Sequence, residues 1–434
     1  MSGSGDNWPV PTEDGRWRWN WSGHTPLRRA RVHEPATVAE VQRLVARAER
    51  VRVVGAGHSF NALADTDGDL LWLGRLAPTA IEIAPDRRSV SISAGLTYDQ
   101  LGPALQAQGL ALANTASLRH ITVAGAVATA THGSGDRLGN LATAVAGLEL
   151  VTADGERVEL RRGADDDRFP GAVVSLGALG VMTRLTLDVE PTYDVVQHVY
   201  AGLPWDALYG HFDEITSAGY SVSLFPTWQQ PVVESVWVKH RLAAGDPAPE
   251  PPADLFGARL QERHLPTLQS DRVRTAINEP GPWHHRLPHF ALSAPGAVGN
   301  ELQSEYFVAR HHAVDAIRAV AAIGPALAAV IGVTELRTVA ADDLWLSPAF
   351  GGDVVAIHFN WWKDWAGVSA VLPAVEAALA PFEPIPHWGK LHALTPAQVM
   401  AGYPRLGDFR QLAAELDPAG VFANDAVRTW LLDA

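Results

Sequence analysis

The sequence predicts an α+β protein with two domains. Its 434 residues exceed what a single hydrophobic core usually serves. Patterns typical of strands and helices alternate up to about residue 190, whereas aromatic residues, histidines and prolines become more frequent after Pro191. We therefore place a domain boundary near residue 190.

The first regular elements are a helix and a strand. Residues 38–50 form an amphipathic pattern, and Thr37 and Glu40 have the spacing of a capping box at its start. Residues 51–54 are expected to follow as a buried strand.

Further elements follow from local patterns. We expect an alternating strand at residues 89–94, a helix at 101–108 that ends at Gly109, a hairpin that joins 148–151 to 158–160 through Ala-Asp-Gly, and a proline-rich loop at 246–254. No internal repeat is evident.

Composition excludes several classes of function. The net charge of −14 argues against a nucleic-acid surface. The chain has no cysteine, so it holds neither a disulfide framework nor a cysteine-bound iron–sulfur cluster. Its histidines and aspartates lack the spacing of metal sites, so we predict no metal.

The sequence indicates a cytoplasmic protein. The first eight residues lack the charged start and apolar run of a secretory signal. The longest apolar stretch, residues 319–333, is broken by Gly324 and Pro325 and is shorter than the roughly 20 residues that span a bilayer. We expect no membrane association and infer no protein partner, and oligomeric state stays open.

The most informative feature is the glycine turn at residues 53–61, Val-Val-Gly-Ala-Gly-His-Ser-Phe-Asn. We expect Gly55 and Gly57 to adopt positive φ angles and to present consecutive amides to a phosphate, with His58 at the mouth of the turn. An ordinary strand end is the alternative, because short glycine motifs are weak signals.

A second unusual stretch covers residues 114–135. It consists almost wholly of small and hydroxylic residues, punctuated by Gly125, Gly133 and Gly135. Such a stretch favours backbone shaped around a ligand, and a tightly packed helix start followed by a loop is the alternative.

Together the two stretches resemble the vanillyl-alcohol-oxidase-type flavoproteins, and specifically the alditol (xylitol) oxidases. The first has the form V-x-G-x-G-H-S and the second A-S-L-x-H-I-x-V-A-G-x-V-A-T-x-T-H-G-S-G. The resemblance continues in order through Gln-Ser-Glu-Tyr (303–306), Glu-Leu-Arg-Thr-Val-Ala-Ala-Asp (335–342), His-Phe (358–359), His-Trp-Gly-Lys (387–390) and residues 403–422.

The resemblance implies a two-domain vanillyl-alcohol-oxidase/PCMH-type FAD-binding fold. Residues 1–190 would form the FAD-binding domain, to which residues 388–434 return. Residues 191–387 would form a separate substrate-binding (cap) domain on a mostly antiparallel sheet.

The cofactor implied is FAD, attached covalently through His58. A neutral imidazole suits this attachment because it is a good nucleophile near neutral pH. The other cofactor-binding positions implied are Val53, Val54, Gly55, Ala56, Gly57 and Ser59 in the first loop, Ser117, Thr122, Gly125, Thr129, Ala130, Thr131 and His132 in the second, and Val181 and His387 beyond them.

Substrate residues are expected to converge on the flavin. Glu335 and Arg337 would share one face of a strand and bind hydroxyl groups, and an ion pair on a solvated sheet is the alternative. Lys390 is similar to a lysine near the reacting carbon, although an isolated lysine is usually a surface residue. We expect Ser117 to orient the substrate, and we expect catalysis from Lys390, Arg337 and His358; Lys390 and His358 are both candidates for the base.

Two positions depart from the alditol oxidase pattern. Asn360 stands where those proteins carry threonine, so it is expected to reshape the far end of the substrate site and leaves the preferred polyol length and stereochemistry open. Arg119 replaces a proline, which puts the local loop geometry in doubt.

The resemblance implies oxidation of the terminal primary alcohol of acyclic polyols, such as xylitol and sorbitol, to the aldose. Hydride would pass to flavin N5, and O₂ would be reduced to H₂O₂. A sugar-lactone or aldose oxidase or dehydrogenase is the alternative within the family, and a flavin-binding protein without turnover is the alternative outside it. Ala116, next to Ser117, is compatible with oxygen access without establishing it.

Overall fold

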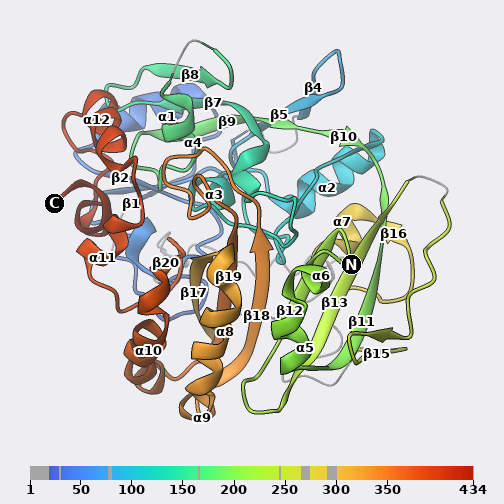
Figure 1. Cartoon of the computed structure of the whole chain (residues 1–434). Coiled ribbons are helices and arrows are strands. Elements are labelled where there is room, and N and C mark those ends of the chain that lie inside the picture. The colour runs from blue at the N-terminus through green and yellow to red at the C-terminus, as the bar shows by residue number, and fades with distance from the viewer. Residues whose placement is uncertain are drawn as a thin grey trace, which may run out of the picture.

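The computed structural model describes residues 19–28, 31–76, 81–164, 167–243, 246–264, 274–290 and 301–433. The first eight residues, on which the prediction about a secretory signal rests, lie outside this part. Two small sheets lie above a large one in the view of Figure 1, with the C-terminal helices alongside both.

The upper part contains a three-stranded parallel sheet and a five-stranded antiparallel sheet. The first has the order β1 (Arg31–His33), β3 (Asp69–Trp72), β2 (Val51–Val54). The second has the order β4 (Ile81–Ile83), β5 (Ser89–Ser93), β9 (Val181–Asp188), β7 (Val145–Val151), β8 (Arg157–Arg161). A short pair joins β6 (Leu110–Ala111) to β10 (Glu190–Pro191). The helices are α1 (Val38–Val45), η1 (Ala62–Ala64), α2 (Tyr98–Ala107), α3 (Val123–Ala128), η2 (Leu141–Ala144) and α4 (Phe169–Val173).

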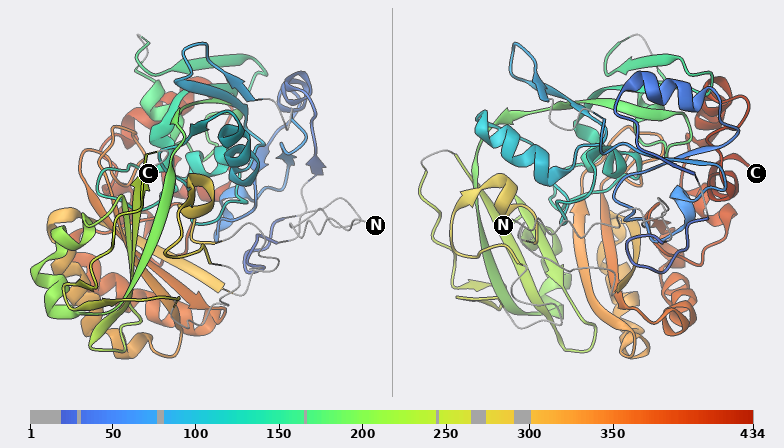
Figure 2. Two further views of the ribbon diagram at one scale, coloured as in Figure 1. Left: turned by 90° about the vertical axis from the view of Figure 1, so that its right-hand side faces the viewer. Right: turned by 180° about the vertical axis from the view of Figure 1, so that it is seen from behind.

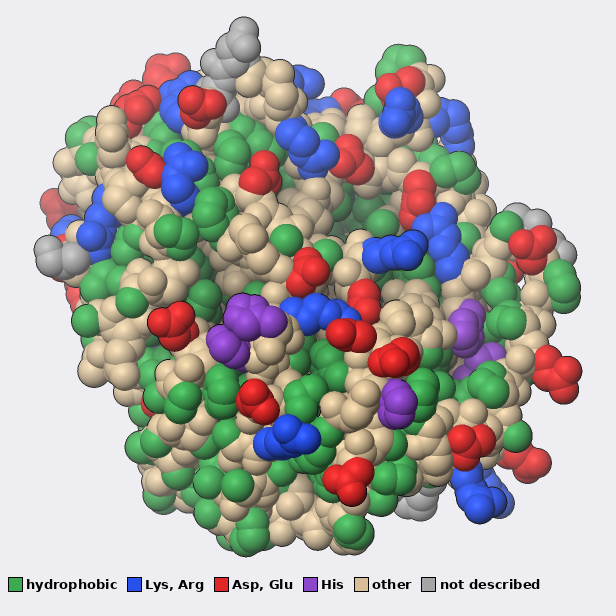
Figure 3. Space-filling view, viewed as in Figure 1, with side chains coloured by type: hydrophobic (Ala, Val, Ile, Leu, Met, Phe, Trp, Pro, Cys, Tyr) green, Lys and Arg blue, Asp and Glu red, His purple; other side chains and the backbone are tan. Residues whose placement is uncertain are grey.

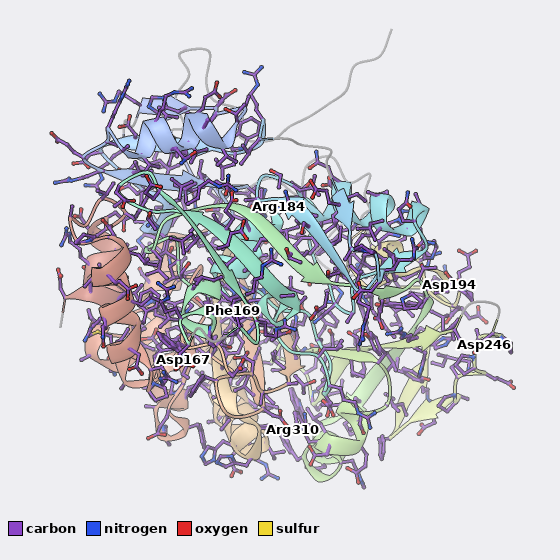
Figure 4. The ribbon with its side chains drawn as sticks, turned by 90° about the horizontal axis from the view of Figure 1, so that it is seen from above. Asp167, Phe169, Arg184, Asp194, Asp246 and Arg310 are labelled. Atoms are coloured by element: carbon purple, nitrogen blue, oxygen red, sulfur yellow. The ribbon has the colours of Figure 1, made fainter. Side chains whose placement is uncertain are left out.

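The lower part is a ten-stranded antiparallel sheet. Its order is β14 (Asp254–Leu255), β15 (Ala258–Leu260), β11 (Asp194–Pro204), β13 (Val232–Leu242), β12 (Ser221–Phe225), β18 (Ile331–Val339), β19 (Val354–Trp362), β17 (Glu301–Ala309), β20 (Ile385–Pro386), with β16 (Gly281–Pro282) paired to β11. In Figure 4, Arg184 lies on β9 of the upper part and Asp194 lies where β11 begins.

Helices cover one face of the large sheet. They are α5 (Trp205–Gly210), α6 (Phe212–Thr216), η4 (Arg310–His312), α8 (Ala313–Ala322), α9 (Gly324–Leu327), α10 (Trp365–Leu379) and η5 (Ala380–Phe382), while α7 (Trp283–Arg286) lies near α2. In Figure 2 the layer that contains α5 and α8 lies on one side of the large sheet. Figure 3 shows acidic and basic side chains interspersed over the helical face.

The first helix is shorter than the sequence predicts. It ends at Val45, because the amides of Arg47 and Ala48 donate to carbonyls three residues back and tighten the chain before β2. Thr37 caps it as expected, but the Glu40 carboxylate accepts from the Ala36 amide at 2.7 Å instead of closing a capping box.

The other predicted elements are present with shifted boundaries. The strand at β2 and the hairpin of β7 and β8 are confirmed, and Gly155 turns the hairpin with φ +83°. Helix α2 begins at Tyr98 instead of residue 101, because Thr97 and Gln100 cap it one turn earlier. Gly109 follows its end at φ +66°. The predicted loop at 246–254 ends one residue earlier, where β14 begins at Asp254.

The C-terminal segment contacts the upper part of the molecule. Its helices are α11 (Pro396–Ala401), α12 (Leu406–Leu416), α13 (Asp425–Val427) and η6 (Arg428–Leu432). The Val51 amide donates to the Val421 carbonyl at 2.8 Å, and Asn424 Nδ2 donates to the Ala62 and Asp65 carbonyls at 2.9 and 2.7 Å. These contacts are what a returning segment would make, although the domain boundaries at 190 and 387 stay a prediction.

One helical stretch of the described chain, Trp365–Phe382, is long and apolar enough to cross a membrane by length and composition. Its buried side chains include Val368, Leu372, Val375 and Leu379, and the helix packs on α8. Core helices of soluble proteins meet the same criterion.

The Asn424 contacts predict a local test of the C-terminal segment. Asn424→Ala leaves buried carbonyls unpaired and removes the cap that Asn424 Oδ1 forms with the Val427 amide at 2.8 Å. We expect a loss of about 2–4 kcal/mol of unfolding free energy in urea titrations. Gln411→Ala, on the exposed face of α12, should change it by less than about 0.5 kcal/mol; equal effects would show that the Asn424 contacts do not stabilise the protein.

Candidate functional site

A cavity of about 1070 Å³ extends from the loop after β2 to Lys390 on the C-terminal segment. One wall comes from the loops of the upper part, and the floor is the face of the large sheet that carries Glu335 and His358. The volume is at the upper end of what ligand sites occupy, so it accommodates a large cofactor together with a small substrate.

The loop after β2 has free backbone donors. Gly57 has the expected positive φ of +63°, but Gly55 does not. Gly55 is required for another reason, because a Cβ there would collide with the Thr122 hydroxyl. Within the described chain, the amides of residues 56–59 donate to no protein acceptor. Free amides beside a cavity fit a pyrophosphate.

His58 lies against Trp21, a residue that the sequence did not single out. Their ring centroids are 4.1 Å apart and the rings are nearly parallel. The segment that carries Trp21 is fixed to the loop, because the Trp21 amide donates to the Gly57 carbonyl at 2.7 Å and Asn20 Nδ2 donates to the Ser59 carbonyl at 2.9 Å. Burial, followed by the nearby His120, holds the pKa of His58 well below its usual value.

His58 is therefore neutral at physiological pH. Its Nε2 atom is buried without a hydrogen-bond partner in the described structure. An unpaired imidazole nitrogen on a residue that lines a cavity fits a covalent bond to a cofactor.

The second glycine-rich stretch is a short helix start followed by a loop, as the alternative interpretation predicts, and several of its residues line the cavity; that it is shaped around a ligand stays a prediction. Thr122 caps α3 by accepting from the Gly125 amide at 3.3 Å, and the Thr129 and Thr131 hydroxyls lie 3.1 Å apart. His132 Nε2 contacts Glu305 Oε1 at 3.2 Å, so this histidine also supports the floor of the site.

Most of the predicted cofactor positions line the cavity. They are Val53, Val54, Gly55, Ala56, Gly57, His58, Ser59, Ser117, Thr122, Gly125, Thr129, Thr131, His132 and His387. Ala130 and Val181 are buried beside the cavity and are absent from its lining, so their assignment as cofactor-binding residues, which for Val181 concerns the backbone, stays a prediction. For Val181 the neighbouring Gly180 and Met182 line it instead, because alternate residues of a strand face opposite sides.

Strand register brings the substrate candidates together. Glu305 on β17 and Glu335 on β18 lie on either side of His358 on β19. Two residues along the same strands, Gln303 pairs with Asn360, and at the ends of the strands Glu301 pairs with Trp362. Directly paired residues share a face, so these side chains form the cavity floor.

Lys390 is bound between two groups of this floor. Its Nζ atom lies 2.6 Å from Glu305 Oε2 and 2.8 Å from His358 Nδ1. Burial lowers the pKa of Lys390 although the Glu305 carboxylate opposes the shift. Burial and then Lys390 lower the pKa of His358 well below its usual value. Burial opposes ionisation of Glu305, but Lys390 and His132 outweigh it and hold the pKa of this carboxyl well below its ordinary range.

Glu335 and Arg337 form a buried ion pair on one face of β18, as the two-residue spacing predicts. The alternative of a solvated surface pair is wrong, because the two side chains are only 6% and 9% exposed. The other oxygen of Glu335, Oε1, lies 2.6 Å from His289 Nε2 and accepts a hydrogen bond from it. Burial lowers the pKa of His289 to about 4 although the Glu335 carboxylate opposes the shift, so its ring is neutral.

A buried lysine, Lys239, contacts the His289 ring on the nitrogen opposite Glu335. Lys239 Nζ contacts the Leu287 carbonyl, the Pro288 carbonyl at 3.3 Å and His289 Nδ1 at 3.2 Å. An ammonium that donates to Nδ1 leaves the imidazole proton on Nε2, where it faces Glu335. Burial lowers the pKa of Lys239 to about 7.

The sequence missed Trp21, Lys239, His289, Glu301 and Glu305 as site residues. Glu305 could have been predicted as a site residue, because it lies in the Gln-Ser-Glu-Tyr motif at an alternating position of a strand. His289 and Lys239 carried no local signal, because they reach the site only through the packing of a loop on β13.

The remaining predicted positions are near the same cavity. Ser117 lines it, and Ala116 next to it is buried. His387 Nδ1 accepts from the Gly389 amide at 3.0 Å, and burial lowers the pKa of His387 to about 3. Arg119 is buried and donates to the His284 carbonyl at 2.8 Å. Among the described residues, no three His, Cys, Asp or Glu side chains are grouped as a metal would require.

Family models match both parts of the chain. Residues 30–161 match an FAD binding domain, and residues 300–430 match D-arabinono-1,4-lactone oxidase. The solved structure of cholesterol oxidase from B. sterolicum superimposes with a TM-score of 0.76 over 95% of this chain and 96% of that one. At 17% identity this similarity shows the fold alone.

Two curated relatives cover nearly the whole chain. Alditol oxidase from a Streptomyces species is 46% identical over 95% of this chain and 98% of its own length. L-gulono-1,4-lactone dehydrogenase from Mycobacterium tuberculosis is 29% identical over 95% of this chain and 98% of its own length. The free amides of residues 56–59, the unpaired His58 and the cavity agree with the FAD that such proteins bind. The chain therefore belongs to the vanillyl-alcohol-oxidase/PCMH-type flavoproteins, in the group that includes alditol oxidase, and is an FAD-dependent oxidoreductase.

Proposed function

We propose that this protein oxidises the terminal primary alcohol of an acyclic polyol, such as xylitol or sorbitol, to the aldose and reduces O₂ to H₂O₂. The observation that carries the proposal is the pair of buried carboxylate–cation contacts, Glu335 with Arg337 and Glu305 with Lys390, on one cavity floor. The 46% identity with alditol oxidase supports the same substrate class.

The inner end of the cavity suits a neutral substrate with many hydroxyl groups. While Lys390 is protonated, two carboxylates and two cations balance in charge there, so the resting site does not favour an anionic or a cationic carbon chain. Carboxylate oxygens accept hydrogen bonds from hydroxyls and the guanidinium of Arg337 donates to them. A plain flavin-binding protein has no need of such buried charges beside its cofactor.

We assign the hydroxyl proton to Lys390. A neutral amine has two N–H bonds, which Glu305 and His358 can accept, and one lone pair that remains for the substrate hydroxyl. The lowered pKa of Lys390 makes this neutral form accessible. Arg337 would stabilise the negative charge that develops on the oxygen.

A bound FAD supplies hydride acceptance at N5 and two-electron transfer to dioxygen. His58 would hold it covalently, because the ring is neutral, its Nε2 atom is unpaired and Trp21 fixes its plane. The amides of residues 56–59 would bind the pyrophosphate.

The substrate class is tested by steady-state assays under air. Xylitol and sorbitol should yield H₂O₂ with kcat/KM at least tenfold above that for L-gulono-1,4-lactone. Turnover of the lactone alone would favour the lactone oxidase alternative. Turnover of polyols only with an artificial acceptor would make the protein a dehydrogenase.

The covalent bond is tested without reference to activity. Acid-denatured wild-type protein should retain flavin fluorescence in the pellet, and His58→Ala should release it. His120→Ala removes the neighbouring ring, 5.3 Å away, and should retain it. Flavin that washes out of the wild-type pellet would contradict the assignment.

The assignment of Lys390 predicts a characteristic pH profile. In the wild type, kcat/KM should rise with pH through the lowered pKa of Lys390 and then level off, because the neutral amine is the active form. Lys390→Met should reduce kcat by about 10²–10⁴-fold while FAD stays bound. Lys390→Arg should not rescue it, since arginine stays protonated; rescue would mean that only the charge is needed.

A further inference from the structure

We propose that the outer end of the cavity is an anionic subsite, formed by Glu301 with Trp362, that binds a protonated amine at the end of a polyol opposite the oxidised carbon. The proposal rests on the proposed function and adds a substrate class, the amino-deoxyalditols, to the neutral polyols.

Strand geometry places Glu301 away from the reacting end. Glu301 and Glu305 lie four residues apart on β17 and therefore share a face, with Gln303 between them. Asn360 Nδ2 donates to Glu301 Oε2 at 2.6 Å and Gln303 Nε2 donates to its Oε1 at 2.6 Å. These bonds draw the carboxylate toward the Gln303 row. Residues two apart along a strand point to the same face and are roughly 7 Å apart, which is about the length of a five-carbon chain.

Glu301 is a carboxylate without a cation. Its carboxylate accepts hydrogen bonds from the two side-chain amides, and it pairs with no Lys, Arg or His in the described structure. Each inner carboxylate, in contrast, has its own cation: Lys390 for Glu305 and Arg337 for Glu335. The amides fix the position of the Glu301 carboxylate but bring no charge, so the outer end carries a net negative charge.

The other cations of the cavity lining are committed elsewhere. Arg52 donates to four backbone carbonyls of the upper part and the C-terminal segment. Arg274 lies over the Trp237 ring on β13, and three strands of the sheet separate β13 from the strand of Glu301. Neither arginine neutralises the outer end.

Trp362 supplies a second feature of an ammonium site. It is paired with Glu301 in the register of β17 and β19, and both side chains line the cavity. Trp362 is 42% exposed, so part of its surface is accessible. A tryptophan face attracts ammonium groups, and a carboxylate beside it pairs with them. A site for hydroxyl groups alone needs neither the net charge nor the indole.

The test compares xylitol with both enantiomers of 1-amino-1-deoxyxylitol at about pH 7, where an alkylamine is protonated. In the wild type, one enantiomer should show a kcat/KM at least fivefold above that of xylitol. Glu301→Gln, which keeps the shape and removes the charge, should lower the amine-to-xylitol ratio at least tenfold. Glu156→Gln removes an exposed charge outside the cavity lining and should leave the ratio unchanged. An amine that is a poorer substrate than xylitol, or a ratio unchanged by Glu301→Gln, would overturn the proposal.

A binding measurement separates this proposal from the proposed function. If no polyol is turned over, the function is wrong, but titration of the flavin absorbance of the holoprotein with the amine and with xylitol still reports the subsite. Tighter binding of the amine that weakens in Glu301→Gln supports it, and equal affinities reject it. Should Glu301→Gln fail to fold, raising the salt concentration about tenfold on wild-type protein should weaken amine binding and leave xylitol binding unchanged; an amine affinity independent of salt would reject the subsite.

Discussion

The buried pairing of Glu305 with Lys390 is the interaction on which the architecture of the site depends. Glu305 is buried on β17, the strand next to the edge strand β20 of the large sheet, and Lys390 contacts it from the C-terminal segment at 2.6 Å. A carboxylate in such a place is tolerated only when a cation and hydrogen bonds compensate for lost hydration. The pair therefore determines where the C-terminal segment crosses the sheet.

The same crossing fixes the loop that carries His58. Asn61 Nδ2 donates to the Trp388 carbonyl at 2.7 Å, and the Phe60 amide donates to the Gly389 carbonyl at 2.7 Å. The cofactor loop and Lys390 are thus adjacent through backbone contacts, although more than 300 residues separate them in sequence. The structure has no need of a flexible closure to bring the proposed covalent link and the proposed base together.

The cavity floor combines two electrostatic environments along one sheet face. At its inner end, charges are paired and supported by neutral histidines: His358 beside Lys390, and His289 between Glu335 and Lys239. At its outer end, Glu301 is held by amides alone. Because alternate residues of a strand face opposite sides, a one-residue shift of β17 would turn Glu301 and Glu305 away from the cavity, and the same shift of β18 or β19 would turn away Glu335 or His358.

The sequence by itself determined the elements whose signals are local. The glycine turn after β2, the cap at Thr37, the hairpin at Gly155 and the shared face of Glu335 and Arg337 follow from spacing over a few residues. The resemblance of ordered motifs added the family and its FAD. Boundaries failed where a nearby cap or a chain reversal decided them, as at Thr97 and after Val45.

Only the tertiary structure decided how the charges are compensated. Neither the contact of Lys390 with Glu305 nor that of His289 with Lys239 and Glu335 has a sequence signature, because each joins segments far apart in the chain. The isolation of Glu301 from cations is likewise a property of the assembled cavity. Spacing along a chain fixes which side chains share a face, whereas the energy of a buried charge depends on every group packed around it.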